Sequence, residues 1–328
     1  MHMADALVSP VVGGVMWAAT AGATAYAVRK MQQNQDTKAP LMGVMGAFVF
    51  AAQMINFTIP GTGSSGHLSG ALLLAAILGP HAAFLSMAVI LMIQALFFAD
   101  GGLLAYGCNV MNMAFFACYV AYPLYRKITG KGMNGKRILM ASLVSAVAAL
   151  QMGAFGVVLE TLLSGRTELP FAAFTAAMQP IHLAIGVVEG LVTAAVLTFV
   201  WKAQPEILQP MNAGKTSGKK VIIAILVATA LVGGVVSWFA SANPDGLEWS
   251  IARVSGQDEL ENSNAVQEAA SNAQERIAPL PDYALPDGNE CLGTSVSGIV
   301  GGAVTIGVLV AAGWVISRVK KRSQPHTV

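Results

Sequence analysis

Charged residues are scarce in this sequence. Only 11% of its 328 residues are Asp, Glu, Lys or Arg, against about a quarter in soluble domains. Apolar residues make up 55% of the chain, which excludes an ordinary soluble domain and predicts a membrane protein. Cysteine is scarce too: Cys108 and Cys118 fall in one predicted helix and Cys291 lies alone in a loop. The sequence therefore has no disulfide framework.

Complete catalytic and nucleotide-binding motifs are also missing. The chain has neither an HExxH helix nor a recognisable catalytic dyad, which argues against an intramembrane metalloenzyme such as a protease. Residues 61–66 (GTGSSG) copy the spacing of a dinucleotide-binding loop, but no strand-and-crossover unit surrounds them. Residues 214–216 (GKT) lack the upstream glycine of a P-loop, because position 209 is Gln. We predict that the protein is not an enzyme and does not itself hydrolyse a nucleotide.

Long apolar runs dominate the sequence. A run of about 20 apolar residues is long enough to cross a membrane as a helix, and the runs predict an all-α polytopic membrane protein with about nine transmembrane helices. The third run is shorter than a span and has His67 at its outer end, so we expect the loop before it to fold back into the protein. The nine runs cover residues 11–28, 40–55, 68–78, 82–98, 105–122, 138–163, 171–200, 221–240 and 296–316.

Basic residues predict the orientation, because cytoplasmic loops carry an excess of Lys and Arg. Sixteen of the 19 basic residues fall in alternate loops, and only Arg166, Arg253 and Arg276 fall in the others. This pattern predicts an external N-terminus and a cytoplasmic C-terminus. Asp5 and the lack of a basic segment before the first apolar run indicate that no signal peptide is removed.

The N-terminal residues Met1 and His2 form a possible metal chelate. The amine of Met1, the amide nitrogen of His2 and the Nδ1 atom of its ring can bind one ion in a nearly flat arc. A fourth nitrogen would complete the square that Ni(II) and Cu(II) prefer, and His67 is the candidate. Alternatively, His2 is merely a second residue and His67 a polar residue at a helix start.

A few polar residues lie within the predicted membrane region, where such residues usually face the bundle interior. Asn56, Gln94 and Asn109 are placed near the external end and could orient His67 or the N-terminal arm as an outer shell. His182 and Glu189 are seven residues apart and so share one helix face. They either form a hydrogen bond between helices or line a metal passage.

Small residues recur on the first predicted helix. Ala19, Ala23 and Ala27 follow at four-residue spacing, and Gly14 and Ala18 lie on a neighbouring stripe. Small residues at this spacing let two helix backbones approach closely in lipid. The stripe serves either packing within the subunit or docking of a partner helix.

Several segments together resemble the NikM/CbiM family, the substrate-binding membrane subunits (S components) of energy-coupling-factor transporters for nickel and cobalt. The resemblance covers about residues 1–203. It implies a metal site made of Met1, His2 and His67, with a transmembrane coupling subunit and ATPase subunits as partners. The matching segments are residues 1–2 (MH), 9–10 (SP), 53–57 (QMINF), 66–68 (GHL), 98–102 (FADGG), 181–183 (IHL) and 188–190 (VEG), with Asn109 and Asn112.

The C-terminal third has a different organisation. Residues 204–220 read as a cytoplasmic linker, and residues 221–328 predict two helices that flank an external loop at 241–294. The loop has ten acidic residues against two basic ones, its stretch from Asp258 to Arg276 favours a solvated helix, and it could gather cations. Its PDGLE sequence at 244–248 resembles the auxiliary NikN subunit of metal transporters, here fused to the S component.

These observations predict a subunit in the cytoplasmic membrane of a bacterium or archaeon that binds Ni(II) outside for ATP-driven uptake. Co(II) uptake for cobalamin synthesis is the alternative, because four nitrogen ligands do not exclude Co(II). A membrane metal receptor is a further alternative, although no signalling domain follows the last predicted helix. Membrane lipid is an expected partner and nucleic acid is not.

Overall fold

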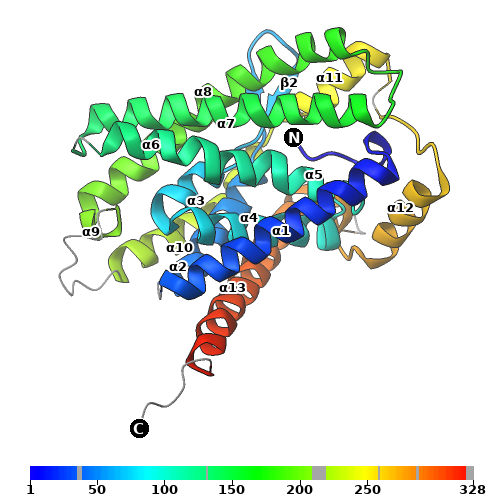
Figure 1. Ribbon diagram of the computed structural model, residues 1–328. Coiled ribbons are helices and arrows are strands. Elements are labelled where there is room, and N and C mark those ends of the chain that lie inside the picture. Colours follow the sequence, from blue (N-terminus) through cyan, green and yellow to red (C-terminus); the bar gives the residue numbers. More distant parts are fainter. Residues whose placement is uncertain (35–38, 131, 209–218, 258, 286–287, 323–328) are drawn as a thin grey trace.

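The computed structural model describes residues 1–34, 39–130, 132–208, 219–257, 259–285 and 288–322 and is largely helical (Figure 1). Its N-terminal region contains α1 (Pro10–Asn34), α2 (Ala39–Gln53), α3 (Ala71–Leu78), α4 (Pro80–Phe98), α5 (Tyr106–Val110), a π-helical segment (Met111–Ala121), α6 (Tyr122–Thr129), α7 (Gly135–Leu163), α8 (Phe171–Ala203) and α9 (Pro205–Leu208). Its C-terminal region contains α10 (Lys219–Gly234), α11 (Gly246–Ser255), α12 (Ala265–Ile277) and α13 (Glu290–Arg322).

Each of the nine predicted apolar runs falls on helical structure, which confirms an all-α membrane protein. Among the described residues, five helices are long and apolar enough to cross a membrane, fewer than the nine predicted spans: α1, α4, α7, α8 and α13. The helices α2 and α10 are shorter apolar helices. The run at 105–122 lies in the continuous stretch from α5 through the π-helical segment to α6, and the short third run is α3.

Close helix packing depends on glycine at several crossings. The long helices α7 and α8 lie side by side (Figure 1), and a Cβ atom added to Gly190 would lie 2.7 Å from the Cα atom of Leu143. The C-terminal helices α10 and α13 pack against each other and against α2. A Cβ atom at Gly298 would lie 2.4 Å from the carbonyl oxygen of Gly233. Small residues thus let these backbones approach closely, and the packing of α10 and α13 on α2 joins the C-terminal helices to the N-terminal region.

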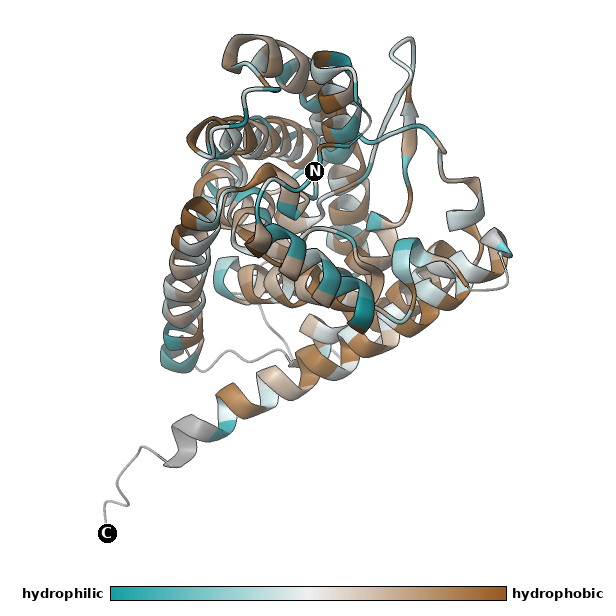
Figure 2. Ribbon diagram, turned by 90° about the vertical axis from the view of Figure 1, so that its right-hand side faces the viewer, coloured by the Kyte–Doolittle hydropathy of each residue, from teal (hydrophilic) through white to brown (hydrophobic). Residues whose placement is uncertain are grey.

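Apolar side chains remain exposed on the outer faces of the helices. In Figure 2 the long helix that leads to the C-terminus carries apolar residues along its outside, and Ile299, Trp314 and Val315 of this helix are more than half exposed. A soluble protein rarely exposes such a continuous apolar surface. The distribution is that of a protein surrounded by lipid.

A short hairpin carries the chain back into the protein before His67. Strand β1 (Phe57–Ile59) pairs antiparallel with β2 (Ser64–Gly66), and Phe57 lies opposite Gly66. The turn uses Gly61 and Gly63 with φ angles of 77° and 73°, which glycine adopts without steric cost. The residues of β2 are all buried, whereas Pro60, Gly61 and Gly63 at the tip are exposed. The loop therefore folds inward only in the strand that leads to His67, and the predicted inward fold does not extend to its tip.

The acidic loop is ordered against the N-terminal region. Helix α12 begins after its cap Asn264, so the predicted helix from Asp258 to Arg276 begins later than expected, and Asp258 itself lies outside the described residues. The side chains of Gln267 and Gln274 are buried and donate to backbone oxygens of Val8 (2.8 Å) and Gly101 (2.7 Å), respectively. This helix is therefore docked rather than simply solvated.

Candidate metal site

The N-terminal arm lies inside the protein, next to helices from both regions (Figure 1). Met3 is fully buried, and its backbone is held by Asn109: the amide of Met3 donates to Oδ1 at 2.7 Å, and Nδ2 donates to the carbonyl of Met3 at 3.1 Å. The amide of Gly102 also donates to that carbonyl at 2.8 Å. These contacts fix the chain two residues from its amine.

The segment after His67 is anchored by a buried carboxylate. Glu189 of α8 accepts hydrogen bonds from the amide of Ser69 (2.8 Å), its hydroxyl (2.9 Å) and the amide of Gly70 (3.1 Å). The side chain of Gln53 donates to the carbonyl of Ser69 at 2.7 Å, and Gln94 donates to Gln53 at 2.9 Å. The chain on the inner side of His67 therefore has a fixed position.

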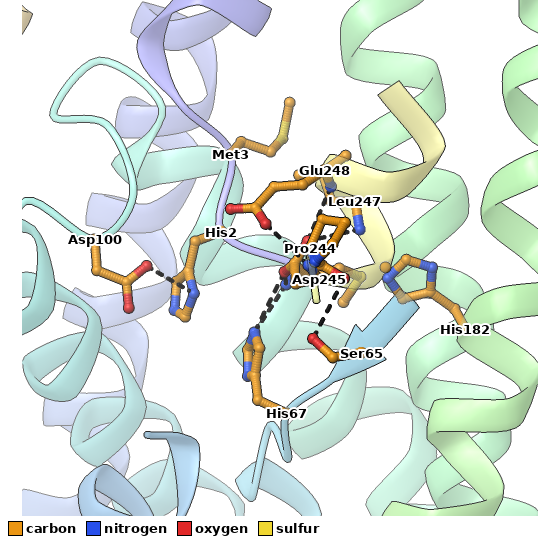
Figure 3. A network of polar contacts seen from close by, with 12 residues as sticks. His2, Met3, Ser65, His67, Asp100, His182, Pro244, Asp245, Leu247 and Glu248 are labelled. Atoms are coloured by element: carbon orange, nitrogen blue, oxygen red, sulfur yellow. Dashed lines mark hydrogen bonds and ion pairs between the residues drawn. The ribbon is translucent and has the colours of Figure 1, made fainter. Parts of the chain in front are cut away.

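The two anchored segments bring the predicted ligands together. The amine of Met1 lies 2.9 Å from Nε2 of His67. The rings of His2 and His67 stack, with centroids 5.1 Å apart and planes at 10°. Figure 3 shows both rings beside the end of the chain. Met1 is only 7% exposed, so the amine, although terminal, is enclosed.

The ring of His2 is paired with a carboxylate. Its Nδ1 atom lies 3.1 Å from Oδ1 of Asp100, whose other oxygen accepts a 2.6 Å hydrogen bond from the hydroxyl of Tyr283. Burial lowers the pKa of His2 to about 4, although Asp100 opposes this shift. Because one ring nitrogen cannot bind a carboxylate and a metal at once, the predicted chelate requires the ring to turn away from Asp100.

Asp245 is a residue of this site that sequence reasoning did not identify. Its Oδ2 atom lies 2.7 Å from the amine of Met1 and 3.6 Å from Nε2 of His67. Burial alone would raise the pKa of Asp245, but the N-terminal ammonium and His67 hold it well below its usual range. The available signal was the PDGLE sequence, of which Asp245 is the second residue.

The rest of the PDGLE segment docks on the hairpin and on α8. The amide of Ser65 donates to the carbonyl of Pro244 at 2.8 Å, and Trp249 donates through Nε1 to the carbonyl of Thr62 at 2.9 Å. A Cβ atom added to Gly246 would lie 2.9 Å from Cδ1 of Ile185. The loop of the C-terminal region thus covers the strand that leads to His67.

The predicted outer-shell residues differ in what they contact. Asn109 clamps the N-terminal arm, as described above. Gln94 reaches the segment after His67 only through Gln53. The backbone carbonyl of Asn56 accepts a 2.7 Å hydrogen bond from Ser241 of the C-terminal region. Of these three residues, Asn109 is therefore the one that hydrogen-bonds, within the part of the chain that the structure describes, to a segment that carries a predicted ligand.

Among the described residues, His182 makes no hydrogen bond to another helix, whereas Glu189 of α8 accepts one from the amide of Gly70, the cap of α3. Nδ1 of His182 pairs with the carbonyl of Met178 one turn earlier in the same helix at 2.8 Å, and Glu189 binds the loop after His67. In the described part of the chain, Nε2 of His182 is buried without a hydrogen-bond partner. It lies beside a small cavity of about 10 Å³ that is also lined by Met1, His67 and Asp245.

The predicted small-residue stripe on α1 is only partly accessible. Ala19 is exposed and Ala23 half-buried, but Ala27 is fully buried. Ala27 therefore packs inside the subunit and cannot contact a partner helix. On the neighbouring stripe, Gly14 and Ala18 are both exposed, and the exposed Gly22 continues it.

The predicted ligand set includes a backbone amine and amide besides side chains. Within the described ranges, no group of three or more His, Cys, Asp or Glu side chains is arranged to hold a metal ion. An open cavity of about 650 Å³ leads to His2 and His67. Its lining includes acidic side chains from both regions, namely Asp100, Asp245, Glu248, Glu259, Glu275 and Asp282.

Known protein families match both the N-terminal and the C-terminal region of the chain. Residues 2–207 match the family described as CbiM, cobalt uptake substrate-specific transmembrane region, and residues 219–318 match the PDGLE domain. The chain is 30% identical to a putative fused nickel transport protein NikMN of Archaeoglobus fulgidus, over 97% of this chain and 98% of that protein. It is also 30% identical to the fused nickel transport protein NikMN of Rhodobacter capsulatus, over 95% of this chain and 97% of that protein. The fold is similar to that in a crystal structure of a transition metal transporter, with a TM-score of 0.55 and 33% sequence identity. The match covers 62% of this chain and 93% of the transporter chain.

Proposed function

The chain belongs to the CbiM family of metal transport proteins, with a PDGLE domain fused to it, and we propose that it captures Ni(II) at the external face of the membrane. In this proposal it is the substrate-binding subunit of an energy-coupling-factor transporter. A transmembrane coupling subunit and ATPase subunits then drive release into the cytoplasm.

The observation that carries the proposal is the enclosed amine of Met1, 2.9 Å from Nε2 of His67, with the ring of His2 stacked on His67. Three of the four proposed ligand nitrogens belong to Met1 and His2. The fourth, Nε2 of His67, already lies beside the amine. Binding through an amide nitrogen requires loss of its proton, which Ni(II) promotes and hard oxygen-seeking ions such as Ca(II) and Mg(II) do not. The ligand set therefore favours Ni(II) over the abundant divalent cations.

The acidic cavity supports an access path from outside. Asp100, Glu248 and Glu259 line it, and His2 and His67 are also part of its lining. Clefts lined by one sign of charge concentrate the opposite ion. A hydrated divalent cation would lose its water as it reaches the nitrogen ligands, and Asp100 would release the ring of His2.

A surface of α1 supports docking of the coupling subunit. In the most apolar stretch of this helix 17% of the residues are buried, the smallest share among the five candidate spans. Among the described residues, nothing lies within 4 Å of a Cβ atom added to Gly14 or Gly22. Close approach through small residues drives helix association in lipid, so we assign docking to the stripe of Gly14, Ala18 and Gly22.

Metal content of the purified protein tests the proposal. Cells that receive equal concentrations of nickel and cobalt should yield full-length protein, with its own N-terminus, that carries one metal ion per chain, mainly nickel by mass spectrometry. Cobalt in that position would support the alternative of cobalt uptake. Protein without bound nickel or cobalt would refute the proposed function.

Transport itself distinguishes an uptake subunit from a membrane receptor. Cells that express the chain with coupling and ATPase subunits should accumulate radioactive nickel, and a hydrolysis-deficient ATPase should abolish accumulation. Metal binding without ATPase-dependent accumulation would favour a receptor.

A further inference from the structure

The PDGLE segment contributes an atom to the metal site. We propose that Asp245 is an oxygen ligand of the transported ion, supplied by the C-terminal region to the nitrogen ligands of the N-terminal region. This inference rests on the proposed function, since it adds one ligand to the same site.

The spacing of three donor atoms carries the inference. Oδ2 of Asp245 lies 2.7 Å from the amine of Met1, the amine lies 2.9 Å from Nε2 of His67, and Oδ2 lies 3.6 Å from that Nε2. Bonds from a divalent metal to nitrogen or oxygen are about 2.0–2.2 Å long, so neighbouring donors at right angles lie about 2.8–3.1 Å apart. Two of the three separations are close to that range, and the third corresponds to a wider angle at the same ion.

The segment around Asp245 holds its carboxylate in place. Oδ1 accepts hydrogen bonds from the amides of Leu247 (2.8 Å) and Glu248 (2.9 Å) and so caps α11. Glu248 in turn accepts from the amide of Asp245 at 2.9 Å, which completes a capping box. Because the cap uses Oδ1, Oδ2 stays directed at the amine.

The charge balance also fits a ligand. The side chain of Asp245 is only 13% exposed, and a buried carboxylate requires a positive partner. The N-terminal ammonium is that partner in the structure. When the amine binds a metal it no longer carries a charge, and the divalent ion takes its place beside the same oxygen.

The position of this oxygen follows from the nitrogen ligands. Four nitrogens in a square leave room for a further ligand only above or below the plane, so Asp245 would approach the ion from one side of that plane as a fifth ligand, tilted away from His67. A fifth ligand distinguishes this site from a purely planar one, and it would make ion binding depend on the docked C-terminal region.

Asp245→Asn separates the role of this side chain as a helix cap from its proposed role as a metal ligand. Asn is as good a helix cap as Asp, but it removes the negative charge and leaves a weaker donor. Asp245→Ala removes the donor altogether. Glu268→Gln is the matched control, because Glu268 is an exposed carboxylate of the same loop that is not part of the cavity lining, and removal of its charge changes none of the three donor atoms.

The experiment measures nickel affinity and X-ray absorption at nickel on the full-length protein. We expect Asp245→Asn and Asp245→Ala to weaken nickel binding by at least the factor of about 10–100 typical of lost metal-site contacts, and Glu268→Gln to bind as the unmodified protein does. The unmodified protein should show five nitrogen or oxygen neighbours and no edge feature of a planar ion, and Asp245→Ala should show four neighbours.

Two results would overturn the inference. One is a planar, four-nitrogen spectrum of the unmodified protein, which needs no variant to fold. The other is unchanged affinity in both Asp245 variants. In either case nickel bound by the unmodified protein would leave the proposed function standing, whereas absence of nickel binding in the unmodified protein would refute the proposed function itself.

Discussion

Extension of the N-terminus is the most direct test of the metal site. Two or more residues placed before Met1 convert its amine into an amide, which removes the terminal donor and the chelate ring that it closes with the amide of His2. The cavity beside Met1 and His67 measures about 10 Å³, which is room for about one water molecule. The added residues therefore cannot be accommodated without displacing the N-terminal arm.

The expected loss is large. Four-ligand zinc sites in small peptides bind with about 10–16 kcal/mol, or about 3 kcal/mol per ligand. Loss of the amine and of the adjacent amide as ligands would then cost about 6 kcal/mol, a factor of about 10⁴ in affinity. The extended chain also loses the ammonium 2.7 Å from Asp245, so the carboxylate is left without that partner.

Isothermal titration with nickel measures this loss, and the same residues added after Val328 are the control. The extension must not be a single residue, because His2 would then be third in the chain and could form a planar four-nitrogen chelate without His67. An extended protein that binds nickel within tenfold of the unmodified affinity would refute the ligand set.

Four further predictions address other parts of the site. His67→Ala should weaken nickel binding by about 100-fold, the equivalent of about 3 kcal/mol per ligand, while His81→Ala should not, because His81 contacts Tyr119; equal nickel affinities in the two variants would exclude His67. Glu189→Gln should weaken binding by about 10–100-fold, because an amide oxygen cannot accept all three hydrogen bonds that position the segment after His67; unchanged affinity would mean that this anchor is not needed. The imidazole of His2 should titrate near pH 4 in the metal-free protein by NMR, since burial lowers its pKa, so its proton competes with the metal only in more acidic solution; a midpoint near 6.5 would contradict its burial. Gly22→Trp should abolish co-purification with the coupling subunit but leave nickel affinity unchanged, because the exposed position lies on the proposed docking stripe; retained co-purification would place the docking surface elsewhere.

Local features of the sequence were sufficient to predict the helices. Hydropathy is a property of consecutive residues, so the nine apolar runs could be located without knowing what they contact, and all nine are helical. Five of these helices reach the length of a span, whereas α2 and α10 are apolar but shorter, and pack against α13. The tight turn before β2 was also predictable, since Gly61 and Gly63 adopt φ angles that other residues avoid, although these two residues lie at the exposed tip of the hairpin.

The grouping of Met1, His2 and His67 was predictable only because terminal nitrogen chemistry and a family resemblance singled them out. The structure brings the amine and His67 together, whereas the role of these residues as ligands stays a prediction. Burial of Ala27 was not predictable, because its four-residue spacing with Ala23 is the same whether the stripe faces lipid, a partner or the core.

Asp245 shows what only the tertiary structure could decide. The sequence determined its local role, since an Asp three residues before Glu248 predicts a helix cap. Its contact with the amine of Met1 joins residues 244 positions apart. That contact depends on how α10 and α13 dock and on how the hairpin before His67 lies against Pro244. Secondary structure follows from neighbouring residues, whereas the metal site is assembled by packing between regions that are distant in the chain.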